Sequence, residues 1–423
     1  MEILLVILVF FFSILVGARG VARDHYNMIA MIPFLTAAWG IVPAYLYING
    51  FHEDFLGYGF QNIDISRRDN YEARMALVKL CFICLCFSMS AFLVTYSRNL
   101  NLRNSVADLG GYKVNLFPVF VAVFIWLANL AYVSEFSPSG LVRIFSPAYF
   151  EDRKFSNYIV RGIHVYLPIA IATVFLIAKR PARTPYILIS ALVFLVLVGT
   201  GQRRELIVWL FYWALLSSTV YGKTVNISIV KASFISMSIL VLFVILWAIR
   251  VYVTNLFRGE VVDPFSIRSP GQVLFGSAAS GFSTFLIVMD YTDQFGVQWF
   301  YSIIQGLVSP IPRFMWEGKP VAADGIIQLY SGMRASPSLF WFGDLYFSFG
   351  ALSYFFAFLS PFTISFLAKS SMSVRSGTLF PVGIWMSSGF ITLFKNGIGT
   401  YLASSLMFFI FCGTLFLFSL RKV

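Results

Sequence analysis

The sequence predicts an all-α, polytopic membrane protein with about eleven transmembrane helices and a helical external cap. Three observations predict this fold class: an apolar composition, a series of apolar segments, and basic residues confined to alternate gaps between them. Hydrophobic residues make up 59% of the chain and charged residues only 12%, and the mean hydropathy is +0.80. That composition excludes a water-soluble domain. The basic balance does not indicate nucleic acid, because topology and anionic lipid at the cytoplasmic face account for it.

The apolar segments give the expected number and bounds of the transmembrane helices. A helix needs about 20 residues to cross the hydrocarbon core. The first segment is interpreted as a retained span, because no basic region precedes it and it carries Glu2. The eleven predicted spans are residues 2–17, 28–48, 75–96, 115–133, 163–178, 184–199, 205–220, 230–256, 345–368, 377–394 and 398–420.

Basic residues in alternate gaps predict the orientation. One set of gaps, with the C-terminus, holds 14 basic residues but only Asp24 and Asp108 as acids, so the rest of the chain is balanced. Lys and Arg in short loops stay cytoplasmic, whereas acids have little influence. The first set is therefore predicted to be cytoplasmic and the balanced face external. The 14 residues are Arg19, Arg23, Arg98, Arg103, Lys113, Lys179, Arg180, Arg183, Lys223, Lys231, Lys369, Arg375, Arg421 and Lys422.

The long external segment 257–344 is predicted to fold as a cap. Its apolar stretches, 272–289 and 297–308, are too short or too interrupted to span, and six prolines divide it. This pattern favours interfacial or re-entrant helices at the outer leaflet. The predicted organisation is residues 1–256 with helices one to eight, residues 257–344 as the cap, and residues 345–423 with helices nine to eleven.

Paired arginines at 203 and 204 stand on a short external loop before the span that starts at 205. A helix N-terminus favours anions, and guanidinium groups bind phosphate oxygens in a bidentate way. Arg203 and Arg204 are therefore candidates for a phosphate or pyrophosphate clamp. The alternative is a pair of headgroup anchors, one of them paired with Glu205.

Two further arginines lie near the outer end of the span 230–256. Arg250 and Arg258 share one helix face, because they are eight residues apart. A charge at membrane depth usually faces a cavity, which favours a functional role for Arg250. Snorkelling to the interface is the alternative, and for Arg258 it is the stronger one.

A rigid, aromatic and charged segment runs from Pro310 to Pro320. Its residues Arg313, Glu317 and Lys319 could line a carbohydrate site, with Trp316 stacking on a sugar ring. The alternative is a proline-rich turn with one local ion pair.

The segment from Asp324 through Tyr330 to Asp344 supplies candidate acids. Asp344 is expected to begin an inward-running helix, so a capping role is the alternative to catalysis. The sequence contains no glycine-rich phosphate loop and no metal-ligand cluster.

These pieces resemble the Wzy-type oligosaccharide repeat-unit polymerases, which include the O-antigen polymerases. The resemblance rests on the Thr-Gly-Gln-Arg-Arg-Glu-Leu turn at 200–206, on Ile311-Pro312-Arg313 with Trp316, and on Phe342-Gly343-Asp344 followed by Phe349-Gly350. The layout, with many spans and a long late external loop, covers the whole chain.

The resemblance implies a GT-C-like glycosyltransferase of the bacterial inner membrane, with its active face in the periplasm. Donor and acceptor would be oligosaccharides linked to undecaprenyl pyrophosphate, and transfer would need no metal, nucleotide or other cofactor. Membrane lipid and a chain-length regulator in the membrane are further implied partners. The implied roles are catalysis by Asp344 or Asp324, pyrophosphate binding by Arg203, Arg204, Arg250 and Arg313, and substrate binding by Arg258, Trp316, Glu317, Lys319 and Tyr330.

Two other functions stay open. An O-antigen ligase has the same donor and layout, although the lack of histidine in 257–344 mildly disfavours it. A lipid-linked oligosaccharide flippase or transporter would need charges along a path through the membrane, whereas the charges here lie at span ends.

Overall fold

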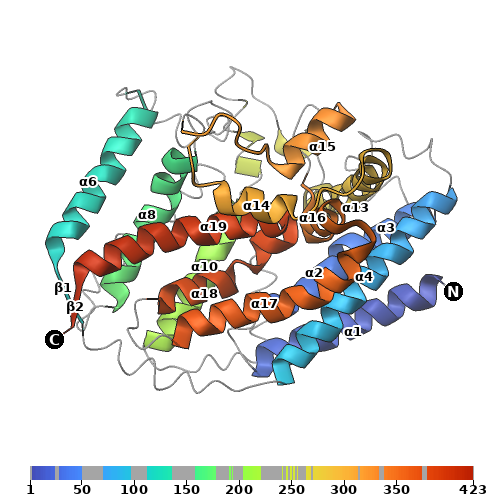
Figure 1. Ribbon diagram of the computed structural model, residues 1–423, viewed down its shortest axis with the longest axis horizontal. Coiled ribbons are helices and arrows are strands. Elements are labelled where there is room, and N and C mark those ends of the chain that lie inside the picture. The colour runs from blue at the N-terminus through green and yellow to red at the C-terminus, as the bar shows by residue number, and fades with distance from the viewer. Residues whose placement is uncertain are drawn as a thin grey trace.

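Helices form almost all of the chain that the computed structural model describes (Figure 1). The predicted all-α class is therefore confirmed, with one local addition, a ribbon of two three-residue strands. The structure describes residues 2–23, 28–49, 70–96, 112–135, 158–177, 203–220, 263–267, 270–312, 315–332, 338–373 and 379–422, with isolated residues at 190–193 and 241–255.

The N-terminal part is a bundle in which α1 packs along α4 and the following segments (Figure 1). Its second span changes helical type along its length, with a 3-10 turn at its start and a π-helical stretch in its middle. At one end of the pair, Arg74 of α4 bonds to Glu2 of α1 at 3.0 Å. The bounds are α1 Glu2–Arg23, η1 Met28–Met31, α2 Ile32–Thr36, η2 Ala37–Ile41, α3 Val42–Ile48 and α4 Asn70–Tyr96.

The middle part consists of α6 (Leu116–Val133), α8 (Tyr158–Ile177) and α10 (Arg203–Val220). Strand β1 (Tyr112–Val114) precedes α6 and pairs antiparallel with β2 (Leu420–Lys422) at the end of the chain. In this register Lys113 lies opposite Arg421. Two segments predicted to share the cytoplasmic face therefore lie at one end of the molecule.

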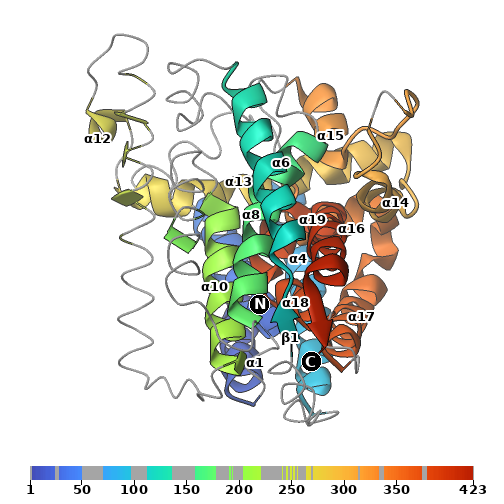
Figure 2. The same cartoon turned by 90° about the vertical axis from the view of Figure 1, so that its left-hand side faces the viewer.

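The predicted cap region contains four described helices and the start of a fifth. They are α12 (Pro264–Ile267), α13 (Pro270–Phe295), α14 (Tyr301–Val308), α15 (Ala323–Ser331) and α16 (Phe340–Phe349). The boundary predicted at 344/345 falls inside α16, because the apolar run that forms this helix begins before Asp344. Figures 1 and 2 show α15 near the end of the molecule opposite to the β1–β2 ribbon, with α14 between that end and the middle of the molecule, beside α19.

The C-terminal part follows α16 through η6 (Gly350–Leu352), α17 (Ser353–Ser373), α18 (Phe380–Ser388) and α19 (Phe390–Ser419). The backbone of α19 leaves the helical conformation at Gly397. This break falls in the gap that separates the predicted spans 377–394 and 398–420.

Six helices in the described part of the chain are long and apolar enough to cross a membrane. The protein is therefore a multi-pass membrane protein. The expected total of about eleven spans stays a prediction, since the predicted spans 184–199 and 230–256 lie largely outside the described residues.

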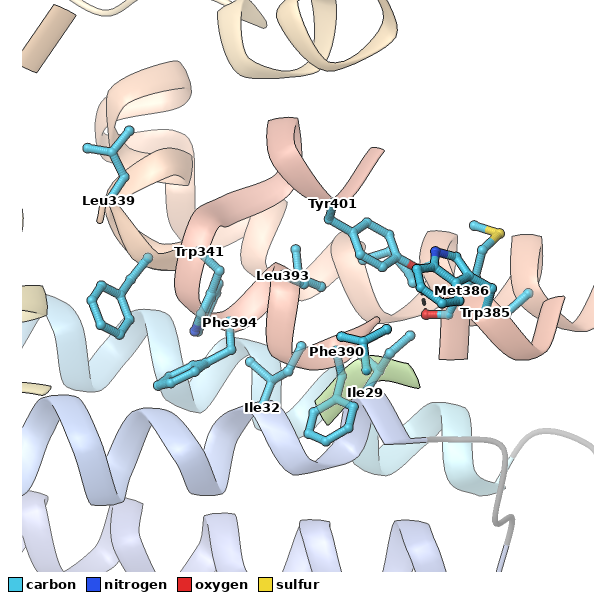
Figure 3. Close-up of a cluster of buried hydrophobic side chains, with 14 of the residues drawn as sticks. Ile29, Ile32, Leu339, Trp341, Trp385, Met386, Phe390, Leu393, Phe394 and Tyr401 are labelled. Carbon is cyan, nitrogen blue, oxygen red and sulfur yellow. Dashed lines mark hydrogen bonds between the residues drawn. The ribbon is translucent and has the colours of Figure 1, made fainter. Parts of the chain in front are cut away.

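Buried aromatic side chains join the C-terminal helices to the N-terminal bundle and to one another. Trp341 of α16 donates a hydrogen bond from its indole nitrogen to Thr36 Oγ1 at 2.7 Å, and its ring lies 4.6 Å from that of Phe87. Tyr401 of α19 donates to the Met386 carbonyl of α18 at 2.9 Å (Figure 3). This core holds α16, α18 and α19 in fixed positions around the break in α19.

Candidate functional site

Asp344 lies at the point where α14, α16 and α19 meet. Its carboxylate is buried and accepts a short hydrogen bond from the Ser302 hydroxyl of α14. The other carboxylate oxygen accepts from the backbone N–H groups of Ile398, at 2.6 Å, and Gly399, at 3.2 Å. Ser348, one turn after Asp344, donates to Ser302 Oγ at 3.1 Å. We call Ser302, Asp344, Ser348 and the backbone at 397–399 the Asp344 cluster.

The Asp344 carboxylate caps a helix, but not its own. Sequence reasoning placed Asp344 at the start of a helix, and this was wrong, because α16 begins at Phe340 and Leu339 occupies its N-cap position. The N–H groups that Asp344 accepts belong to the part of α19 that follows Gly397. A carboxylate at a helix N-terminus is stabilised by the unpaired N–H groups and the helix dipole. Asp344 therefore fixes the break in α19 from a neighbouring helix.

Glycines allow the three helices to approach closely. Gly397 adopts φ +80°, and a Cβ there would overlap the Asp344 carboxylate. A Cβ on Gly306 would come within 2.5 Å of the Gly399 carbonyl oxygen, and one on Gly399 within 2.6 Å of the Ser302 carbonyl oxygen. The Asp344 cluster thus depends on backbone contact between α14 and α19, which side chains would prevent.

Replacing Gly397 with alanine should destabilise the protein more than replacing Gly296. Both residues have positive φ, +80° and +79°, but a Cβ at Gly296 meets no atom within 4 Å. Backbone strain should cost about 1–3 kcal/mol at either position, and overlap at Gly397 should add about 1–3 kcal/mol. Thermal unfolding of the two variants in detergent measures the difference. Equal midpoints would contradict the close contact between Gly397 and Asp344.

Asp324, the second candidate acid, lies in the first turn of α15 and is partly exposed. Its carboxylate accepts from the N–H of Gly325 at 3.0 Å, and it is near enough to Asp344 for the two carboxylates to interact electrostatically. The structure therefore brings the two candidate acids into one region. Tyr330, at the other end of α15, packs its ring against Tyr291 and Phe295 of α13 at 5.4 and 5.8 Å.

The structure describes three of the four residues between α14 and α15 that were predicted to bind sugar, and they differ in burial. Lys319 is buried and donates from Nζ to the carbonyl oxygens of Ser309, at 2.6 Å, and Ile311, at 2.7 Å. Glu317 and Trp316 are exposed. Lys319 thus holds the C-terminal end of α14, whereas Trp316 and Glu317 are accessible to a ligand.

Helix α10 begins at Arg203, so Arg203 and Arg204 occupy its first turn. The sequence placed them on the loop before a span starting at 205, so the helix begins two residues earlier than predicted. The buried Glu205 follows the two arginines.

Arg250, Arg258 and Arg313 lie outside the described residues. In the described part of the chain, no three His, Cys, Asp or Glu residues are placed to hold a metal ion.

Sequence reasoning missed Ser302, Ser348 and Gly397. The serines carry no local signal, since small polar residues are common in apolar helices. Gly397 does offer one, because it lies in the gap predicted between the last two spans, and Gly399 follows two residues later. Models of protein families, curated proteins and solved structures were each compared with this chain, and none matches it.

Proposed function

We propose that the protein is a glycosyltransferase that joins undecaprenyl-pyrophosphate-linked oligosaccharide repeat units at the periplasmic face of a bacterial inner membrane. The supporting observation is that Asp344 of α16 and Asp324 of α15 are near enough to interact electrostatically. Helix α15 lies near the end of the molecule opposite to the basic β1–β2 ribbon (Figure 2), and the exposed Trp316 belongs to the segment that leads into α15. A GT-C-like arrangement of about eleven spans belongs to this proposal.

The proposed reaction needs two kinds of groups. The leaving group carries its own pyrophosphate, so the protein must supply positive charge where negative charge develops. Arg203 and Arg204, with Arg250 and Arg313, would supply it. A carboxylate must also accept the proton of the acceptor hydroxyl. Trp316 would stack on a sugar ring, and Arg258, Glu317 and Tyr330 would complete the substrate site. Lys319 has no substrate role in this proposal, because its ammonium group is buried and donates to the carbonyl oxygens of Ser309 and Ile311.

The contacts favour Asp324 over Asp344 as the base. Both Asp344 oxygens accept hydrogen bonds from protein groups, and the side chain is buried. Asp324 is partly exposed in the first turn of α15. A general base must come within hydrogen-bond reach of the substrate proton. Asp324 therefore takes the base role in this proposal, and Asp344 becomes a positioning residue.

Deletion of the gene and electrophoresis of the cell's polysaccharide test the proposal. A polymerase loss leaves single repeat units attached to the lipopolysaccharide core in place of long chains. A ligase loss leaves no repeat units attached. A flippase loss traps repeat units on the inner leaflet. Only the first pattern, reversed by the intact gene, agrees with the proposed function.

A further inference from the structure

Helix α14 is amphipathic in the opposite sense to a helix of a water-soluble protein. Its inward face carries Ser302 and Gln305, whose side chains are only 3% and 6% exposed. Its outward face carries Ile304 and Leu307, which are 48% and 53% exposed, and Phe300, the residue before the helix, is 45% exposed. In water, apolar side chains turn inward and polar ones outward. Polar groups that face the bundle and apolar groups that face outward are instead typical of helices in lipid.

The outward face of α14 continues the outer surface of a predicted membrane span. The ring of Phe300 lies 5.1 Å from that of Phe349 and 5.9 Å from that of Phe356, and the latter two rings are stacked. Helix α17 exposes Leu352 just before its start and Phe355 in its first turn. The segment 340–372 is long and apolar enough to cross a membrane, so its exposed side chains face hydrocarbon. Ring contacts of Phe300 therefore join the exposed apolar side chains of α14 to those of α17.

The C-terminal end of α14 has the internal hydrogen bonds that a helix end in lipid requires. The last carbonyl groups of a helix lack partners within the helix, and hydrocarbon supplies none. Lys319 Nζ donates to the carbonyl oxygens of Ser309 and Ile311, which follow the last helical residue, Val308. The Ser309 hydroxyl also donates to the Gly306 carbonyl of the last turn at 2.9 Å, so protein groups supply hydrogen bonds at this end of α14.

Helix α15 has the ordinary amphipathic sense, apart from the exposed Leu329. It buries Ala323 and Ile327 and leaves Asp324 and Gln328 partly exposed. Two neighbouring helices of one segment thus have opposite polarity. This difference is the one expected if lipid surrounds the outward face of α14 and water surrounds that of α15.

We propose that α14 is a re-entrant helix whose outward face contacts the hydrocarbon chains of the bilayer lipid. This lipid face consists of Phe300, Ile304, Leu307 and Ile311. Eight helical residues extend about 12 Å, less than half of the roughly 30 Å hydrocarbon core. Helix α14 therefore enters one leaflet without crossing the bilayer. The Asp344 cluster then lies on the inward side of α14, opposite to the face that contacts lipid. This inference does not depend on the proposed function.

Spin labels test the lipid face in the full chain, purified and reconstituted in phosphatidylcholine vesicles. Ile304→Cys and Leu307→Cys are made in a chain whose four native cysteines, Cys81, Cys84, Cys86 and Cys412, are replaced by alanine. Collisions of the label are measured with oxygen, which concentrates in hydrocarbon, and with a water-soluble nickel chelate. At both positions, oxygen collisions should exceed nickel collisions several-fold. Leu359→Cys on α17 serves as the lipid control and Glu317→Cys as the water control, since both residues are exposed.

Two results would overturn the proposal. Nickel collisions at 304 and 307 as frequent as those at Glu317→Cys would place the face in water. Low accessibility to both reagents would mean that protein, such as a second copy of this chain, covers it. If the cysteine-free chain does not fold, p-benzoylphenylalanine at Ile304 in the otherwise unchanged chain replaces the label. Photo-crosslinks to phospholipid then support the lipid face, and crosslinks to protein alone overturn it.

Discussion

Replacing Asp324 with asparagine should reduce repeat-unit polymerisation by about 10²- to 10⁴-fold, the usual contribution of a general base. The amide keeps the size of the side chain and accepts the hydrogen bond from the Gly325 N–H, but it takes up no proton at neutral pH. Protein level should therefore hold while long polymer disappears. Polymer length is measured by electrophoresis, and protein level by immunoblotting of membranes.

Asp344 provides the matched comparison. Asp344→Asn should stay active, because the amide oxygen can accept from the N–H groups of Ile398 and Gly399, and asparagine caps helices as well as aspartate does. Asp344→Ala should lose folded protein, since each buried donor left unpaired costs about 1–3 kcal/mol. An inactive but well-folded Asp344→Asn variant, together with an active Asp324→Asn variant, would restore Asp344 as the base.

Replacing Arg203 or Arg204 with alanine should lower polymerisation by about 10²- to 10³-fold, as the loss of a group that stabilises transition-state charge does. The same change at Arg250 or Arg313 should lower polymerisation to a similar extent. Lysine in place of each arginine should restore little of the polymerisation activity, because its ammonium group cannot make the bidentate contact of a guanidinium group. Polymer length at matched protein level is again the measurement.

Arg74 is the control for these variants. It lies at the start of α4, pairs with Glu2 at 3.0 Å and is well exposed. Surface ion pairs contribute about 0–1 kcal/mol, so Arg74→Ala should polymerise normally. If Arg203→Lys and Arg204→Lys both kept full activity, positive charge alone would suffice and the bidentate clamp would be wrong.

Local sequence predicted some helix bounds closely, whereas the predicted starts at 75, 163 and 345 lie five residues after those of α4, α8 and α16. The spans predicted at 28–48 and 115–133 correspond to Met28–Ile48 and Leu116–Val133. The gap predicted at 395–397 contains the break at Gly397. Hydropathy succeeds here because each transmembrane segment must satisfy its own backbone and expose apolar side chains to lipid, and both requirements are met within about 20 residues.

The start of α16 shows where local reasoning fails. A charged residue at the edge of an apolar run resembles a cap, so Asp344 was taken as the beginning of the helix. The helix begins four residues earlier because Phe340, Trp341 and Phe342 are buried in the core. Only the packed core makes burial of Asp344 possible, since the Ser302 hydroxyl and two N–H groups of α19 compensate its desolvation.

The sequence by itself determined that this is a helical, multi-pass membrane protein, and it predicted the helix that follows the paired arginines to within two residues. Tertiary structure alone decided that Asp344 caps α19, that Lys319 holds the end of α14, and that the polar face of α14 points inward. The reason is the distance along the chain: the partners of Asp344 lie 42 to 55 residues away. Hydropathy predicts whether a residue lies in lipid, in water or in the protein interior. Only tertiary packing decides which helices donate hydrogen bonds to the buried Asp344 carboxylate.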